Sequence, residues 1–148
     1  MLIYLDNCCY NRPYDDQSQI TTSIETQAKL FIQEQVILGK LRLVSSYVLN
    51  AENSMNRFLS RRFAIQQFIN QYSEIYVSAK NQETIERKAG QMMERSSIKF
   101  MDACHLACAV FAKSGYFLST DYRLLKFRTD EIRLMNPVDF LRELEGFS

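Results

Sequence analysis

The stretch MDACHLACAVFA (residues 101–112) carries only two polar side chains, Asp102 and His105. A helix that is apolar on nearly every side is buried, so this segment predicts a core helix. A carboxylate on such a helix costs several kcal/mol unless another group compensates its charge. The dipole at the helix N-terminus contributes only about 0.3–1 kcal/mol, which is too little. We therefore expect Asp102 to face a specific site.

Around this helix the chain alternates between short apolar runs and helical patterns. Strands separated by helices predict an α/β fold with a mostly parallel sheet covered on both faces. Ser45 or Ser46 can cap the second helix. A polar loop is expected over residues 7–18. The expected strands are 2–5, 41–44, 75–77, 116–119 and 132–135, and the expected helices are 20–38, 46–59, 61–72, 82–96, 102–113 and 137–146.

The apolar residues of these helices predict which faces turn toward the sheet. The inward residues expected are Ile20, Ile24, Ala28, Phe31 and Leu38 in the first helix, Val48, Ala51, Met55 and Leu59 in the second, Ile65, Phe68 and Ile69 in the third, Ile85, Ala89, Met92 and Met93 in the fourth, and Phe140, Leu141 and Leu144 in the last.

Length and composition describe one domain over residues 1–148, without repeats or linkers. Lys plus Arg is 18 and Asp plus Glu is 17, which excludes a strongly basic nucleic-acid coater but not a nuclease. No signal peptide and no membrane-spanning run is expected. The four cysteines are then expected to be reduced thiols in a cytoplasmic protein.

Four acids are directed to one edge of the predicted sheet. Asp6 and Asp121 end strands, Glu52 lies early in the helix that leaves the second strand, and Asp102 begins the helix that returns to the fourth. Ligands of open α/β sheets bind at this carboxyl edge. Two carboxylates about 5.5 Å apart repel by roughly 3 kcal/mol at an effective dielectric of 20. A hard divalent cation, Mg²⁺ or Mn²⁺, would remove that conflict.

These motifs resemble the PIN domain, a family of metal-dependent nucleases that includes many VapC-like ribonuclease toxins. The matching segments, in order, are IYLD (3–6), Glu52 after Val48-Leu49, IKFMDACHLA (98–107) and FLSTD (117–121). The resemblance implies a three-layer α/β/α fold with a five-stranded parallel sheet of order 3-2-1-4-5. It also implies that Asp6, Glu52, Asp102 and Asp121 are the catalytic and metal-binding acids. Many relatives carry a further acid where this chain has Tyr122-Arg123, which leaves open whether one or two ions bind.

The function expected from this resemblance is metal-dependent endoribonuclease activity on RNA, or on single-stranded nucleic acid generally, by in-line attack of an activated water. A role as the toxin of a toxin–antitoxin pair would add an antitoxin partner, and a homodimer is also compatible. The substrate-binding residues expected are Arg12, Lys99 and Arg123, which lie beside the acids, and Ser119 and Thr120, which match small polar positions of the family. Further candidates are Arg57, Arg61, Arg62, Lys126, Tyr14 and Tyr122.

Several alternatives stay open at this point. A PIN-like module could bind nucleic acid or protein without turnover. His105 could shuttle protons, although a core histidine satisfied by a neighbour is favoured. Zinc could bind the cysteines, although buried thiols are favoured because no CxxC pair is present. A haloacid-dehalogenase-type phosphohydrolase is rejected, since its second aspartate would fall at Cys8. The segment 61–77 could be a dimer or antitoxin face, although core is favoured.

Overall fold

The computed structural model describes residues 1–146, so the last two residues of the expected domain lie outside the described part. Its centre is a five-stranded sheet of order β3-β2-β1-β4-β5 in which every neighbouring pair is parallel. The strands are β1 (Leu2–Leu5), β2 (Arg42–Ser46), β3 (Ser73–Val77), β4 (Tyr116–Leu118) and β5 (Arg133–Met135). The α/β/α fold and the strand order expected from the sequence are confirmed.

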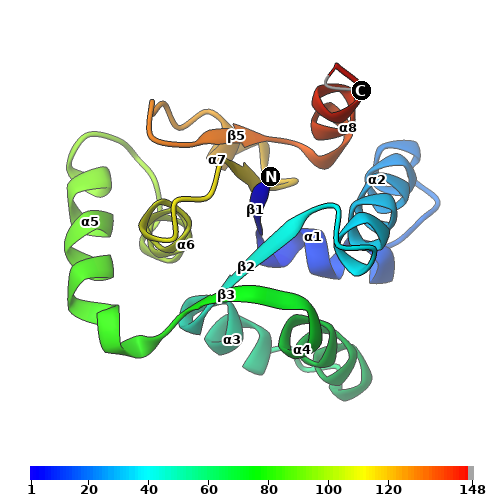
Figure 1. The fold of residues 1–148 in the computed structure, drawn as a ribbon, viewed down its shortest axis with the longest axis horizontal. Helices are drawn as coiled ribbons and strands as arrows, with labels where there is room; N and C mark the ends of the chain where they lie inside the picture. The colour runs from blue at the N-terminus through cyan, green and yellow to red at the C-terminus, as the bar shows by residue number, and fades with distance from the viewer. Residues whose placement is uncertain (147–148) are drawn as a thin grey trace.

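Helices cover both faces of this sheet (Figure 1). One layer contains α5 (Gln82–Glu94) and α6 (Phe100–Phe111), and the other contains α1 (Asn7–Asn11), α2 (Ile20–Ile37) and α8 (Pro137–Gly146). The remaining elements are α3 (Tyr47–Ser54), α4 (Leu59–Tyr72), α7 (Tyr122–Leu125) and the short 3₁₀ turns η1 (Arg12–Tyr14) and η2 (Ala79–Asn81).

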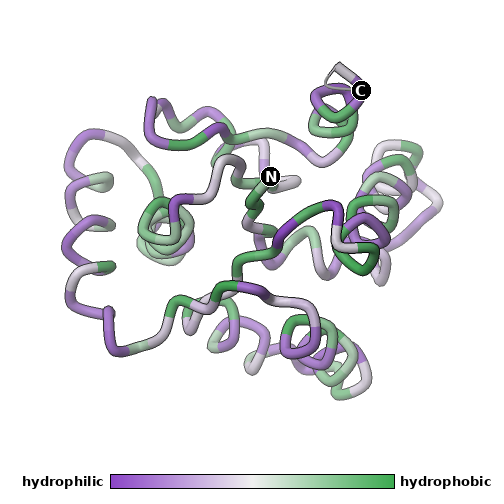
Figure 2. The backbone as a smooth tube through the Cα atoms, viewed as in Figure 1, coloured by the Kyte–Doolittle hydropathy of each residue, from purple (hydrophilic) through white to green (hydrophobic). Residues whose placement is uncertain are grey.

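Alternation along the strands builds two cores, one on each face. Tyr4 and Phe117 point toward α5 and α6, whereas Ile3, Leu5 and Leu118 point toward α2 and α8. This follows from the period of two in a strand, which sends successive side chains to opposite faces. Figure 2 shows the same arrangement in α5, whose hydrophobic residues face α6 and whose hydrophilic residues lie outside.

The prediction of a polar loop over residues 7–18 is wrong for its first part. Residues 7–14 are not a loop, because they form α1 and η1. Asp6 begins α1 as its N-cap, and its side chain accepts a hydrogen bond from the backbone N–H of Asn7. Short polar caps of this kind start a helix even where the sequence lacks an apolar period.

The predicted inward face of α2 is also wrong. Ile20 is 78% exposed, and Ile24, Phe31 and Leu38 are exposed too, so of the predicted set only Ala28 is buried. The buried side includes Glu25, Lys29, Ile32 and Val36. On this side Ile32 and Val36 pack in the core, and Glu25 accepts a hydrogen bond from Asn136 and pairs with Arg12, so apolar packing and polar contacts both hold this rotation of the helix.

Three smaller expectations fail around α3 to α5. Met55 and Leu59 are each 67% exposed, because α3 ends at Ser54 and a new helix starts at Leu59. Ala51, inside α3, is exposed as well. Met93 is exposed at the outer side of α5. In residues 61–77 the core expectation holds in part: Ile65, Ile69 and Val77 are buried, whereas Phe63 and Tyr76 are exposed. The other inward residues of the remaining helices are buried or pack against the cores.

The four cysteines are free thiols and do not form one cluster. Cys104 and Cys108 belong to the core beneath α5 and α6, whereas Cys9 is buried in the opposite core and Cys8 packs at its edge. This dispersal across the sheet argues against a four-cysteine zinc site. None of the helices in residues 1–146 has the length and apolar character needed to cross a membrane.

Candidate metal centre

Asp6 is held at the carboxyl end of β1 by groups from two elements. Its backbone N–H donates to the Leu118 carbonyl over 2.9 Å, which extends the pairing of β1 with β4 beyond the last strand residue. Its side chain accepts hydrogen bonds from the Asn7 backbone N–H at 2.8 Å and from the Ser119 hydroxyl at 2.9 Å. Asp6 is only 5% exposed, so its carboxylate is both buried and fixed.

Asp121 is placed beside Asp6 through the same serine. The Asp121 backbone N–H donates to Ser119 Oγ over 3.0 Å, so one buried hydroxyl links the two acids. Asp121 is also the N-cap of α7, where its Oδ1 accepts from the N–H groups of Arg123 and Leu124. Ser119 and Thr120 are both buried, and the Thr120 backbone N–H donates to Cys8 Sγ rather than to an acid.

Glu52 comes from α3, which begins at Tyr47 with Ser46 as its N-cap, one of the two caps that the sequence predicted. The Ser46 hydroxyl accepts a hydrogen bond from the Leu49 N–H at 3.0 Å, a standard N-cap contact. Glu52 follows in the second turn and points across the carboxyl edge of the sheet toward α6. There its Oε1 lies 3.1 Å from Nε2 of His105.

The four predicted acids line one cavity of about 360 Å³, together with Asn7, Cys8, Asn11 and Asp15. The convergence predicted from topology is therefore what the structure contains. The sequence did not predict Asn11 as a site residue. It lines the acid cavity because residues 7–11 form a helix.

The pKa of Asp102 shows that the carboxylates in this cavity repel one another. Burial, together with the negative charges of Asp6 and Asp121, raises the pKa of its carboxyl to about 6. Among residues 1–146, the basic side chain that pairs with Asp6 or Glu52 is His105 alone, with Nε2 at 3.9 and 3.1 Å from their carboxylate oxygens. One imidazole cannot neutralise four carboxylates, so the donor set fits a bound divalent cation.

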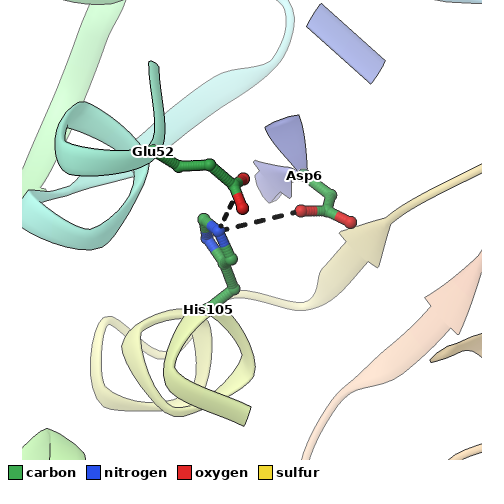
Figure 3. Close-up of side chains that lie close together, drawn as sticks. All are labelled: Asp6, Glu52 and His105. Atoms are coloured by element: carbon green, nitrogen blue, oxygen red, sulfur yellow. Dashed lines mark hydrogen bonds and ion pairs between the residues drawn. The ribbon is translucent and has the colours of Figure 1, made fainter. Parts of the chain in front are cut away.

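His105 lies at the base of this group (Figure 3). It is fully buried, its Nδ1 is 2.7 Å from the Tyr4 hydroxyl, and its Nε2 faces Glu52. The expectation of a core histidine satisfied by its neighbours is thus confirmed. Burial lowers the pKa of His105, but the hydrogen bond with Glu52 and the charge of Asp6 outweigh it, leaving the pKa above its ordinary value. Ligand atoms of Asp6, Glu52 and His105 lie within 4.8 Å of one another, so this group could hold a metal ion.

A second cavity of about 600 Å³ opens beside the first and shares Asp102 and Asp121 with it. Its wall carries Lys99, Arg123 and Lys126, so positive charge adjoins the acids on this side. Arg12 lies elsewhere: its guanidinium is 3.2 Å from Glu25 and 3.0 Å from Asp15. Arg57 and Arg61 contact the ring of Phe58, with Arg61 also over Tyr14.

The raised pKa of Asp102 predicts how metal binding depends on pH. A cation needs the deprotonated carboxylate, so protons compete with it below about pH 6. We expect the Mn²⁺ affinity to fall about tenfold between pH 7 and pH 5, measured by isothermal titration calorimetry. In Asp102→Asn the affinity should be weaker and this part of its pH dependence absent. An affinity that is equal at both pH values would contradict the prediction.

Fold and site together define an α/β protein with a cluster of acids, joined by one histidine, at the carboxyl edge of a parallel sheet. Structures of this fold include VapBC2 from Rickettsia felis bound to a DNA fragment from its promoter, with TM-score 0.57 and 11% identity over 92% of this chain and 98% of that one. FitAcB from Neisseria gonorrhoeae has TM-score 0.53 and 14% identity over 91% and 97%. FitAB bound to an IR36 DNA fragment has TM-score 0.55 and 15% identity over 92% and 95%.

At the level of sequence, no family model matches the chain and no curated protein matches it. The likeness to the solved structures therefore establishes the fold.

Proposed function

We propose that this protein is a metal-dependent endoribonuclease of the PIN type, which hydrolyses phosphodiester bonds in RNA. The observation that carries the proposal is the convergence of Asp6, Glu52, Asp102 and Asp121 on one cavity whose neighbour is lined by basic residues. A negative centre suits a cation, and a positive flank suits the phosphates of a nucleic-acid strand. The net charge of +1 is thus a sum that includes two local regions of opposite sign.

The acids are the proposed ligands of Mg²⁺ or Mn²⁺. When bound, such an ion supplies charge neutralisation at the scissile phosphate and activation of a water. Ser119 holds Asp6 and the Asp121 backbone in place, which fixes two ligands relative to each other before any ion arrives. Preorganisation of this kind lowers the cost of assembling the site.

The substrate strand is proposed to leave the acid cavity over Lys99 and Arg123. Both line the cavity that shares Asp102 and Asp121 with the metal centre. Arg12, predicted as a substrate contact, is not included because Glu25 and Asp15 already engage its guanidinium.

The direct test is cleavage of defined RNAs and single-stranded DNAs with Mg²⁺ or Mn²⁺, with excess chelator as the control. Metal-dependent internal cuts in RNA support the proposal. Binding of Mn²⁺ and RNA without any cleavage would instead support the PIN-like module without turnover.

Charge removal at the basic flank should weaken RNA binding more than catalysis. For Lys99→Gln and Arg123→Gln we expect the KM for RNA to rise about fivefold each and the kcat to change less than twofold, because phosphate contacts mainly set affinity. The slope of log affinity against log salt should fall by about 0.7 per contact removed. Lys40→Gln is the matched control, since Lys40 is exposed just before β2, at the opposite end of the sheet. Equal effects in the Lys40 variant would contradict the assignment.

We further propose that the nuclease is a toxin held inactive by a protein antitoxin. The support is the resemblance to VapC-like toxins and the likeness of the fold to the VapBC2 and FitAB structures. Exposed apolar side chains along α2, namely Ile20, Ile24 and Phe31, offer a surface for such a partner. Growth arrest on induced expression, relieved by co-expression of an adjacent small gene, would support this role, and growth unaffected by the active nuclease would oppose it.

A further inference from the structure

We infer that His105 is a positioning residue: its Nε2–H donates a hydrogen bond to Glu52 and holds this proposed ligand at the metal centre, and Tyr4 and Ser46 orient the imidazole. The inference rests on the proposed function, because it assigns His105 a role toward the same metal centre. It adds residues that the acid cluster alone does not include.

The chain of contacts is short and continuous, and it is buried up to His105. Ser46 Oγ and the Tyr4 hydroxyl are 2.7 Å apart, the Tyr4 hydroxyl and His105 Nδ1 are 2.7 Å apart, and His105 Nε2 and Glu52 Oε1 are 3.1 Å apart. Tyr4, Ser46 and His105 are all 0% exposed. Water therefore does not compete for the contacts among Ser46, Tyr4 and His105, whereas the Glu52 side chain is 26% exposed on the cavity side.

The direction of the hydrogen bonds follows from the capacity of each group. A carboxylate only accepts, so the contact at Glu52 needs a hydrogen on His105 Nε2. In the neutral ring Nδ1 then accepts, and the Tyr4 hydroxyl donates to it. Ser46 Oγ accepts from the Leu49 N–H and donates its own hydrogen to the Tyr4 oxygen. Every group from Ser46 to Glu52 is satisfied in this direction.

The opposite direction leaves a conflict. If neutral His105 carried its hydrogen on Nδ1, the bare Nε2 would face a carboxylate oxygen at 3.1 Å with no hydrogen between them. A buried acceptor pair of this kind is costly. A doubly protonated ring also keeps Nε2–H directed at Glu52, so both favourable forms make the same contact.

The two ends of this series of contacts belong to one helix and its N-cap. Ser46 is the N-cap of α3 and Glu52 lies in its second turn, whereas Tyr4 belongs to β1 and His105 to α6. The contacts therefore close a ring that ties α3 to β1, the strand that directly precedes Asp6. Partners of metal ligands commonly orient them in this way, and their loss typically weakens metal affinity about 10–100-fold.

The chain contains a single histidine, so the hydrogen position can be read directly. In metal-free protein carrying ¹⁵N-labelled histidine, NMR should show hydrogen on Nε2 of His105, coupled across the hydrogen bond or protected from exchange. A neutral ring with hydrogen on Nδ1 and a bare Nε2 would overturn the inference. So would a loss of that Nε2 hydrogen on addition of Mg²⁺, because His105 would then be a ligand rather than a support.

Mn²⁺ affinity gives the second readout. We expect Tyr4→Phe to weaken Mn²⁺ binding about tenfold and His105→Leu about 10–100-fold, with partial rescue in His105→Gln, whose amide can still donate. Tyr10→Phe is the matched control, because the buried Tyr10 hydroxyl has no hydrogen-bond partner within residues 1–146. Its Mn²⁺ affinity should equal that of the wild type.

A double-mutant cycle separates positioning from general structural damage. In a Glu52→Gln background, Tyr4→Phe and His105→Leu should each change Mn²⁺ affinity less than about twofold, because the group through which they act is gone. Losses as large as in the wild type would overturn the inference. If the wild type binds Mn²⁺ and Tyr4→Phe binds it equally well, the inference about His105 is overturned but the proposed metal centre stands. If the wild type binds no Mn²⁺, the proposed metal centre is overturned as well.

Discussion

Replacing Asp102 with asparagine is expected to reduce RNA cleavage more than about 100-fold and yet to stabilise the metal-free protein. The loss of activity follows because the amide is a poorer ligand than a carboxylate and leaves the proposed metal centre incomplete. Initial rates on a defined RNA with saturating Mn²⁺ measure it. Cleavage at the wild-type rate would contradict the role of Asp102.

The gain in stability follows from the raised pKa of Asp102, which reaches about 6. The Asp102 carboxyl binds its proton more tightly in the folded state than in the unfolded state. Its ionisation therefore lowers the free energy of unfolding as the pH rises from about 4 to 6, and the full loss is reached above pH 6. Because the side chain is partly exposed, we discount the shift and expect about 1 kcal/mol, or 2–4 °C in Tm.

Thermal melts with chelator at pH 7.5 and at pH 4 check this sign. Asp102→Asn should melt above the wild type at pH 7.5 and within error of it at pH 4, where both side chains are neutral. A variant that melts lower at pH 7.5 would show that the carboxylate is not under electrostatic strain.

Asp6→Asn is expected to abolish cleavage to a similar extent but to destabilise the fold. The Asp6 carboxylate accepts hydrogen bonds from the Asn7 N–H and the Ser119 hydroxyl. Asparagine offers only one acceptor oxygen, so its NH₂ group meets the Ser119 hydroxyl, which already accepts from the Asp121 N–H. The Ser119 hydrogen then exchanges a carboxylate oxygen for Cys8 Sγ, a weak acceptor 3.3 Å away, at a cost of about 1–2 kcal/mol.

The measurement for Asp6 is the same melt with chelator at pH 7.5, in parallel with Asp102→Asn. We expect the Tm of Asp6→Asn to fall by about 2–5 °C, opposite in sign to that of Asp102→Asn. The two variants thus serve as controls for each other, since both remove one negative charge from one cavity. Equal shifts of Tm in the two would show that charge, and not the hydrogen bonds of Asp6, sets its contribution.

The elements of this fold could be predicted because local patterns were strong. The run Leu2–Leu5 is a strand with the expected bounds, and Gln82–Glu94 and Phe100–Phe111 are helices within about two residues of them. Rotation of helices was harder, because an apolar side chain does not say which face is covered. In α2 the buried side carries Ile32 and Val36 together with the ion pair and hydrogen bond of Glu25, while the apolar residues of the other side stay exposed.

The amino-acid sequence by itself determined the alternation of strands and helices, and from this the edge where Asp6, Glu52, Asp102 and Asp121 meet. Parallel strands end on one side, so topology alone is sufficient for that conclusion. Only the tertiary structure decided the contacts around the acids. Tyr4, Ser46 and His105 belong to three elements separated by 42 and 101 positions along the chain, and their hydroxyl and ring nitrogens meet because β1, β2 and α6 pack together. A hydrogen bond depends on distances of a few tenths of an ångström, which no sequence pattern specifies.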